Sequence, residues 1–253
     1  MYLFDLTGRH AIVTGGSRGL GFAMAEGLCE AGAEVLVIGS GENAKKAEEK
    51  LTQKGFHCKS LALDLSDRSA REEGFKKAVE MLGGTLDILV NNAGANYRED
   101  SENYPIDEWD KLIELNLTAV FEFSQLAAKQ FMAQGTKGKI INTASLTSYF
   151  GGYRIPAYAA SKGGVAQLTK AFANEWTGKD INVNAIAPGY MNTDMNTALV
   201  NDSGRNQEIL SRIPAHRWGV PDDVKGVCIF LASDAAGYVS GAVIPVDGGY
   251  LGK

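Results

Sequence analysis

Cysteine is scarce in this chain of 253 residues, which has only three. They are Cys29, Cys58 and Cys228. Small secreted folds held by disulfides need paired cysteines, and zinc sites need closely spaced ligands. An odd number at wide spacing fits neither. We therefore expect three reduced, mostly buried thiols and no metal site.

Net positive charge is also lacking, because 25 Lys and Arg face 30 Asp and Glu, which gives a net charge of −5. This balance argues against a nucleic-acid partner, although a local arginine cluster can still bind an anionic substrate. No apolar run approaches the ~18 residues of a membrane helix, and no charged-then-apolar leader opens the chain. We expect a cytoplasmic protein with a small-molecule substrate and no membrane partner.

Proline-rich linkers, low-complexity tracts and internal repeats are absent as well, and the chain has only 6 prolines. Hydrophobic residues make up 45% and charged residues 22%, the balance of a globular protein. A chain of this length is ordinary for one α/β domain with a single large sheet. We therefore predict a single catalytic domain over residues 1–253.

Short apolar segments alternate with amphipathic segments of helix length. This alternation predicts βαβ units and a Rossmann-type, doubly wound parallel sheet of about seven strands with helices on both faces. The segment 189–217 breaks the rhythm with turn and polar residues, which predicts a substrate lid. The expected strands are 11–13, 35–38, 61–63, 88–90, 140–141, 183–186 and 243–246, and the expected helices are 20–31, 43–54, 68–82, 108–133, 157–178 and 222–232.

A glycine-rich loop, 14–21, directly follows the first expected strand and opens the first helix. Glycines allow close approach of backbone to phosphate, and the helix N-terminus offers free N–H groups to a pyrophosphate. We therefore predict a dinucleotide site here. Its expected members are Gly15, Ser17, Arg18, Gly19, Leu20 and Gly21.

The choice between NAD and NADP stays open at the end of the second strand. NAD sites usually place an acidic residue there to hold the ribose hydroxyls. Here Gly39 and Ser40 occupy that place, and the acidic Glu42 comes later. Arg18 could pair with a 2′-phosphate, or it is a solvated loop cation.

Tyr158 and Lys162 are four residues apart on an expected helix, so their side chains lie on one face. A free phenol has a pKa of about 10 and is a poor acid or base near neutral pH. A nearby cation favours the phenolate. We therefore expect Lys162 to lower the pKa of Tyr158 and to fit it for proton transfer at an alcohol oxygen. Such pairs also occur on solvated helix faces, so the rest of the chain decides.

Further polar residues follow the other strands, where open α/β sheets bind ligands. Ser145 precedes Tyr158 by 13 positions, Asn116 lies in the helix 108–133, and 91–94 and 188–189 follow the fourth and sixth strands. In order and spacing these residues resemble the short-chain dehydrogenase/reductase family, over essentially the whole chain. A catalytically idle dinucleotide-binding scaffold is the alternative of a different class.

The resemblance implies a role for each residue. Tyr158 would be the general acid/base, Lys162 would lower its pKa and hold the nicotinamide ribose, and Ser145 would bind the substrate oxygen. Asn116 would hold a water that links Lys162 to solvent. The remaining cofactor contacts would be Ser40, Asp64, Leu65, Asn92, Ala93, Gly94, Pro188, Gly189 and Thr193.

Within the family, the segments 127–147, 174–191 and 212–219 resemble the bacterial sugar-acid dehydrogenases. That resemblance implies hydride transfer between a nicotinamide cofactor, with NAD suggested, and a secondary hydroxyl or ketone of a sugar acid. The glycine loop is more similar to the gluconate enzymes and the acyl-carrier-protein reductases, so a 3-oxoacyl thioester is the rival substrate. The resemblance also implies a homo-oligomer, commonly a tetramer.

Three arginines are candidates to bind a substrate carboxylate, which prefers a bidentate guanidinium. Arg154 lies between Ser145 and Tyr158 and is the first choice. Arg98 follows the fourth-strand loop, and Arg217 ends the expected lid. The alternative is that all three form surface or structural salt bridges.

Overall fold

Seven short segments pair side by side as parallel strands in the computed structural model, which describes residues 2–252. The strand order is β3-β2-β1-β4-β5-β6-β7, so the predicted fold class is confirmed. The order reverses between β1 and β4, which makes this the switch point where such sheets bind ligands. The strands are β1 (His10–Thr14), β2 (Glu34–Gly39), β3 (Cys58–Ala62), β4 (Ile88–Asn91), β5 (Gly138–Thr143), β6 (Ile181–Pro188) and β7 (Val243–Val246).

Strands β5 and β6 are longer than the sequence predicts, because polar residues continue both of them inside the protein. Asn142 is fully buried, and its amide donates to the Thr169 hydroxyl at 3.0 Å. Asn182 accepts a bond from the buried Lys139 ammonium at 2.7 Å. Strand β3 starts three residues earlier than predicted, at Cys58, because it is an edge strand with partly exposed polar residues.

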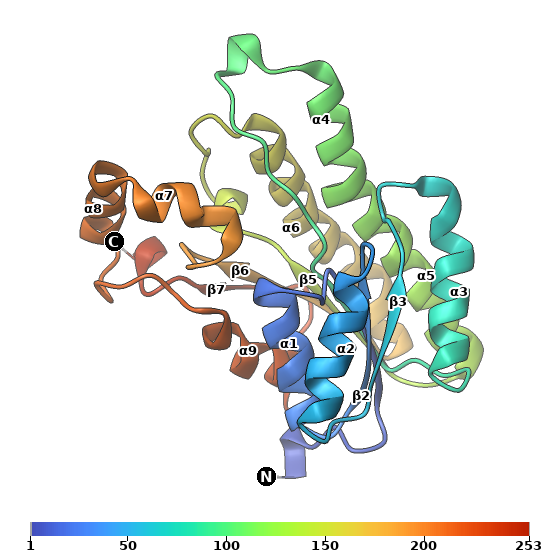
Figure 1. Ribbon diagram of the computed structural model, residues 1–253. Helices are drawn as coiled ribbons and strands as arrows, with labels where there is room; N and C mark the ends of the chain where they lie inside the picture. The colour runs from blue at the N-terminus through green and yellow to red at the C-terminus, as the bar shows by residue number, and fades with distance from the viewer. Residues whose placement is uncertain (1, 253) are drawn as a thin grey trace.

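Helices cover both faces of the sheet (Figure 1). One core lies under the first face, and a second core, centred on Phe123 and Phe131, lies under the other. The first face carries α1 (Gly19–Glu30), α2 (Asn43–Gln53) and α9 (Lys225–Ala232). The second face carries α3 (Arg71–Met81), α5 (Ala119–Gln134) and α6 (Pro156–Trp176).

The predicted helix 108–133 is interrupted near its middle. It consists of α4 (Ile106–Ile113), a π-helical turn (Glu114–Thr118) and α5. A π turn inserts an extra residue into the helical ladder and commonly marks a functional position. The 3₁₀ turns lie at Tyr2–Phe4, Arg68–Ala70, Ser101–Asn103, Leu146–Ser148, Thr177–Lys179, Asp194–Asn196, Pro221–Val224, Asp234–Ala236 and Tyr250–Gly252.

The segment 189–217 has more regular structure than the sequence predicts. It contains two short helices, α7 (Thr197–Asn201) and α8 (Ser203–Arg212). Its isolated apolar patches are the inward faces of these helices: Ile209 packs in a cluster with Leu146. The segment therefore shares a hydrophobic cluster with Leu146, the residue that follows Ser145.

The described residues contain no helix long and apolar enough to cross a membrane. Across the same residues 2–252, no group of three or more His, Cys, Asp or Glu side chains could hold a metal ion.

Candidate active site

The glycine loop connects β1 to α1 and is closely packed against the end of β4. A Cβ on Gly21 would lie 2.2 Å from the Gly15 carbonyl oxygen and 2.4 Å from Nδ2 of Asn92, so only glycine fits. Arg18 is the N-cap residue of α1 and makes no side-chain capping bond. The helix N-terminus therefore keeps amide donors for an anion, which suits a dinucleotide pyrophosphate.

The glycine loop also meets the end of β2 and the start of the segment 189–217. Ser17 lies against Gly39, next to Ser40, and Gly19 lies nearest to Thr193. Nη1 of Arg18 is 3.7 Å from a carboxylate oxygen of Asp194, and both side chains are at least three-quarters exposed. An ion pair of this length and exposure contributes little, so the Arg18 guanidinium is available to a ligand.

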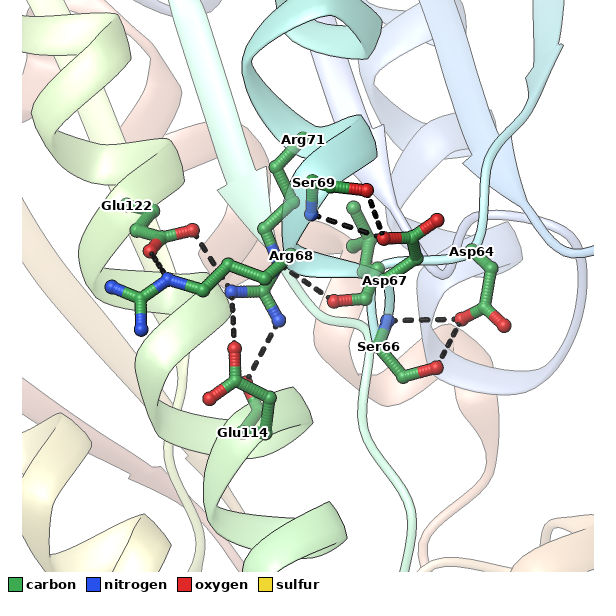
Figure 2. Close-up of polar contacts among 9 residues, drawn as sticks. Asp64, Ser66, Asp67, Arg68, Ser69, Arg71, Glu114 and Glu122 are labelled. Carbon is green, nitrogen blue, oxygen red and sulfur yellow. Dashed lines mark hydrogen bonds and ion pairs between the residues drawn. The ribbon is translucent and has the colours of Figure 1, made fainter.

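Asp64 and Leu65 form a tight turn directly after β3. The Asp64 carboxylate accepts hydrogen bonds from the Ser66 hydroxyl at 2.7 Å and from its amide at 2.9 Å, as Figure 2 shows. These bonds hold the pKa of Asp64 below its ordinary value. Leu65 is buried, and Nε of Arg71 donates to its carbonyl at 2.7 Å.

The loop after β4 is fixed by the last residue of β1, Thr14, which the sequence reasoning missed. Its hydroxyl accepts from the amides of Asn92 at 3.0 Å and Ala93 at 3.1 Å. The side-chain amide of Asn92 donates to the Gly15 carbonyl at 3.2 Å. A threonine at the end of a buried strand, just before a glycine loop, was the signal that could have shown this.

Tyr158, Lys162 and Ser145 come together at the carboxyl end of β5. The Ser145 hydroxyl lies beside the Tyr158 phenol and acts to lower its pKa. Nζ of Lys162 is 5.7 Å from the centre of the Tyr158 ring and donates to the Thr143 carbonyl at 2.6 Å. Gly94 approaches the same ammonium, because a Cβ built on it would lie 3.8 Å from Nζ.

Burial dominates the titration of this group. It raises the pKa of Tyr158, against the lowering effects of the Ser145 hydrogen bond and of the Arg98 charge. Burial also lowers the pKa of Lys162 from its ordinary 10.5 to about 8. In the chain alone the net shift of the Tyr158 pKa is therefore upward, opposite to the lowering expected from the sequence, and its cause is desolvation.

Asn116 lies in the π turn with its side chain fully buried. Its Oδ1 accepts from the Ala95 amide at 2.9 Å, and its Nδ2 donates to the Ala95 carbonyl at 2.9 Å. Nδ2 also lies 3.3 Å from the Ser161 hydroxyl, which itself donates to the Tyr158 carbonyl at 2.8 Å. The carboxamide is thus committed to protein partners that lead to Tyr158.

Pro188 ends β6 and Gly189 follows it. The Gly189 amide donates to the Val246 carbonyl at 2.9 Å, and a Cβ on Gly189 would lie 2.6 Å from Cα of Asp247. The turn is therefore fixed against the end of β7. In the sheet, β4 and β5 lie between this turn, which follows β6, and the glycine loop, which follows β1.

The three candidate arginines have different surroundings. Arg154 pairs with Asp100 at 3.0 Å and Glu99 at 3.3 Å, and Arg217 makes a two-pronged pair with Asp223 at 2.7 and 2.9 Å. Arg98 has no side-chain hydrogen bond or ion pair among the described residues. Arg98 is exposed at the surface; partial desolvation lowers its pKa, and the nearby phenols of Tyr190 and Tyr158 act in the opposite sense.

The chain matches, over residues 15–251, a family model described as enoyl-(acyl carrier protein) reductase. The match spans the glycine loop, the Tyr158 group and the segment after β6. The chain belongs to the short-chain dehydrogenase/reductase family.

Similar proteins narrow the comparison. A 2-dehydro-3-deoxy-D-gluconate 5-dehydrogenase from Dickeya dadantii is 48% identical over 250 residues, which cover 99% of this chain and 98% of the relative. A structure from Agrobacterium tumefaciens, described as a 2-deoxy-D-gluconate 3-dehydrogenase with bound NADP, is 46% identical, covers both chains fully and has a TM-score of 0.94. A gluconate 5-dehydrogenase from Burkholderia cenocepacia, in complex with NADP and tartrate, is 37% identical with a TM-score of 0.95 and covers 99% of this chain and 98% of its own.

Gly21→Ala tests whether the close packing of the glycine loop against Asn92 is needed for cofactor binding. The added methyl must displace the Gly15 carbonyl or Asn92, so we expect the cofactor dissociation constant to rise about tenfold or more. Fluorescence titration of the reduced cofactor measures it. Gly226→Ala is the matched control, because it adds a methyl to helix α9 in open space. Equal cofactor affinities of the two variants would show that the glycine loop does not bind the cofactor.

Lys162→Met tests the buried ammonium. Because the folded pKa of about 8 lies below 10.5, the unfolded chain binds more protons between these pH values, and stability rises with pH across that window. From pH 7 to pH 9.5 we expect the wild type to gain about 2 kcal/mol relative to Lys162→Met in urea unfolding.

Lys170→Met, which removes an exposed lysine of the same helix, is the control and should leave the pH slope unchanged. If the free energy of unfolding of Lys162→Met changes with pH as that of the wild type does, the ammonium is not desolvated as described.

Proposed function

We propose that the chain is a nicotinamide-dependent sugar-acid dehydrogenase that interconverts a secondary hydroxyl and a ketone, with 2-dehydro-3-deoxy-D-gluconate 5-dehydrogenase as the specific activity. The observation that carries the proposal is the grouping of Ser145, Tyr158 and the buried Lys162 at the carboxyl end of β5. Full-length similarity to a relative of that activity, at 48% identity, supports the choice of substrate.

In this mechanism the protein orients the substrate and moves a proton. The Ser145 hydroxyl holds the substrate oxygen, and Tyr158 donates a proton to that oxygen in reduction or accepts one in oxidation. Because burial raises the pKa of Tyr158, the phenol carries its proton at neutral pH and is ready to act as an acid. When bound, the nicotinamide cofactor supplies or accepts the hydride.

The positive charges around Tyr158 serve the opposite direction. Oxidation requires the phenolate, and the charge of Arg98 together with the Ser145 hydrogen bond lowers its energy. Lys162, anchored on the Thr143 carbonyl, is placed to hold the nicotinamide ribose. Asn116, as part of the π turn, is assigned the proton relay to solvent.

We assign the substrate carboxylate to Arg98 in preference to Arg154. A guanidinium without a protein partner, whose charge acts on both Tyr158 and the lid residue Tyr190, is suited to an anionic ligand. Arg154 instead holds the loop that carries Arg98: its carbonyl accepts from the Glu99 amide at 3.0 Å, and its side chain pairs with Glu99. Arg217 is occupied by Asp223.

Two buried oxygen atoms favour a hydroxylated substrate over a 3-oxoacyl thioester. Oδ1 of Asn96 and Oγ1 of Thr147 have no hydrogen-bond partner among the described residues. Thr147 lies two residues after Ser145, and Asn96 directly follows the Ala95 that Asn116 binds. A buried polar atom without a partner costs about 1–3 kcal/mol, which sugar hydroxyls would offset and an acyl chain would not.

For the cofactor, we propose that both forms bind and that NADP(H) is accepted in spite of the family resemblance that suggests NAD. The end of β2 offers Gly39 and Ser40 rather than a carboxylate, and Arg18 has only a long, exposed pair. The similar structures from Agrobacterium tumefaciens and Burkholderia cenocepacia hold NADP.

We further propose one domain over residues 1–253, a lid at 189–217, a homotetramer and a cytoplasmic location. The hydrophobic cluster that contains both Ile209 and Leu146 supports the lid, because it brings the segment near Ser145. The long helices α5 and α6, with Phe121 partly exposed beside Phe172, support an interface between copies.

Turnover of 2-dehydro-3-deoxy-D-gluconate, gluconate and a 3-oxoacyl thioester, each with NAD(H) and NADP(H), tests the function through nicotinamide absorbance. We expect the deoxy-ketogluconate to have the highest kcat/KM. Tyr158→Phe should lower kcat by about 10³-fold or more with the cofactor dissociation constant unchanged, because only the proton donor is lost.

Three results would count against the function. Preference for the thioester would favour an acyl reductase. Tight cofactor binding without turnover of any secondary alcohol would favour a scaffold. Near-normal turnover by Tyr158→Phe would reject the mechanism.

Arg98→Met tests the carboxylate assignment. Loss of the guanidinium that pairs with the substrate carboxylate should lower kcat/KM for the sugar acid by about 100-fold. For a neutral polyol analogue kcat/KM should fall by no more than about threefold. Arg217→Met is the control and should change neither value. An equal loss on both substrates, or an acid-selective loss in Arg154→Met instead, would contradict the assignment.

A further inference from the structure

Arg71, the first residue of α3, is buried to 1% exposure and uses all three of its guanidinium nitrogens. Nε donates to the Leu65 carbonyl at 2.7 Å. Nη1 pairs with the carboxylates of Glu114 at 2.7 Å and Glu122 at 2.9 Å. Nη2 donates to the backbone carbonyl of Glu114 at 3.3 Å. Figure 2 shows these contacts converging from the loop after β3 and from the helix α4–α5.

One side of the guanidinium holds the loop that begins with Asp64 and Leu65. Within the loop, Ser66 donates to Asp64 and Ser69 donates to Asp67, and the Leu65 side chain packs in the second core. The Arg71–Leu65 bond adds a polar contact that ties the backbone of this turn to the start of α3. The turn carries Asp64 and Leu65, which by the family resemblance would border the adenine of the cofactor.

The other side holds the π turn. The Glu114 carbonyl accepts from the amide of Ala119, five residues ahead, which is the bond that defines a π turn. Arg71 donates to that same oxygen, so its charge stabilises the carbonyl at the point where the helix departs from α geometry. Asn116 lies two residues further on.

Contacts continue from the π turn to the reacting group. Asn116 bonds Ala95 and lies within hydrogen-bond distance of the Ser161 hydroxyl, which donates to the Tyr158 carbonyl. Arg71 thus lies between the adenine-side turn and the segment that positions Asn116. The planar fork of arginine is needed, because a single ammonium cannot reach Leu65, Glu114 and Glu122 in these directions.

We propose that Arg71 is a positioning residue that couples cofactor binding to proton transfer. By fixing the Leu65 turn and the Asn116 π turn with one side chain, it sets cofactor affinity and the placement of the relay together. This inference rests on the relay role that the proposed function gives to Asn116 and on the cofactor contacts that the family resemblance implies for Asp64 and Leu65.

Arg71→Lys keeps the charge and removes the fork, so it is the principal test in the full-length enzyme. We expect KM for the cofactor to rise about fivefold or more and kcat to fall about tenfold. We also expect the pH dependence of kcat to move by about half a pH unit or more. Active-site titration and circular dichroism give the folded, active fraction.

A second variant guards against misfolding. Arg71→Met combined with Glu114→Gln and Glu122→Gln leaves no unpaired charge in the buried cluster. We expect it to fold and to show the same changes in KM and in the pH profile. Arg68→Met is the matched control: it removes an exposed arginine from the same Glu122 carboxylate and should change neither quantity.

A merely structural role would lower the active fraction or the thermal midpoint and leave KM and the pH profile of the active enzyme unchanged, which would overturn the proposal. Equal changes in Arg68→Met would overturn it too. If the wild type turns over no sugar acid, the proposed function fails separately. In that case cofactor titration still decides, and an unchanged dissociation constant in Arg71→Lys rejects the coupling.

Discussion

The hydrogen bond from the Lys162 ammonium to the Thr143 carbonyl, at the carboxyl end of β5, is the interaction around which the rest of the site is arranged. It holds a cation in a buried place where water cannot solvate it, so the charge must be compensated by nearby dipoles. The sheet supplies those dipoles because the carboxyl ends of parallel strands meet at one edge. Gly94 has no side chain to displace the ammonium, and Asn116 is anchored from the opposite side.

Desolvation changes how the pair of Tyr158 and Lys162 works. In an exposed helix, an ammonium four residues from a phenol would simply favour the phenolate. Lys162 is buried and Tyr158 is partly buried, so desolvation pushes both groups toward their neutral forms, and Ser145 and the charge of Arg98 oppose that trend at the phenol. Proton transfer then depends on groups from one helix and two different loops rather than on one helical spacing.

Most of the fold could be predicted from the sequence, because buried parallel strands read as short apolar runs and glycines mark the first turn. The Tyr158, Lys162 and Ser145 group also could be predicted, since spacing and strand order alone indicate it. The π turn could not: Glu114–Thr118 has ordinary helical residues, and its Glu114 carbonyl is also bonded by Arg71, which is more than 40 positions away in sequence. The choice among the arginines also required structure, because the partners of Arg154 and Arg217 are set by loop geometry.

The Asn116 carboxamide pairs with both backbone groups of Ala95 in the way that a neighbouring strand would. At Ala95, after β4, both backbone groups are therefore hydrogen-bonded as they would be inside the sheet, with the Asn116 side chain in place of a neighbouring strand. Surface loops normally accept insertions and deletions freely. The loop between β4 and Ala95 has a fixed length. An added residue would turn the N–H and C=O of the backbone at this point away from the side-chain amide of Asn116. A change in loop length is then accommodated only beyond Ala95, in the part of the loop where Asn96 and Arg98 lie.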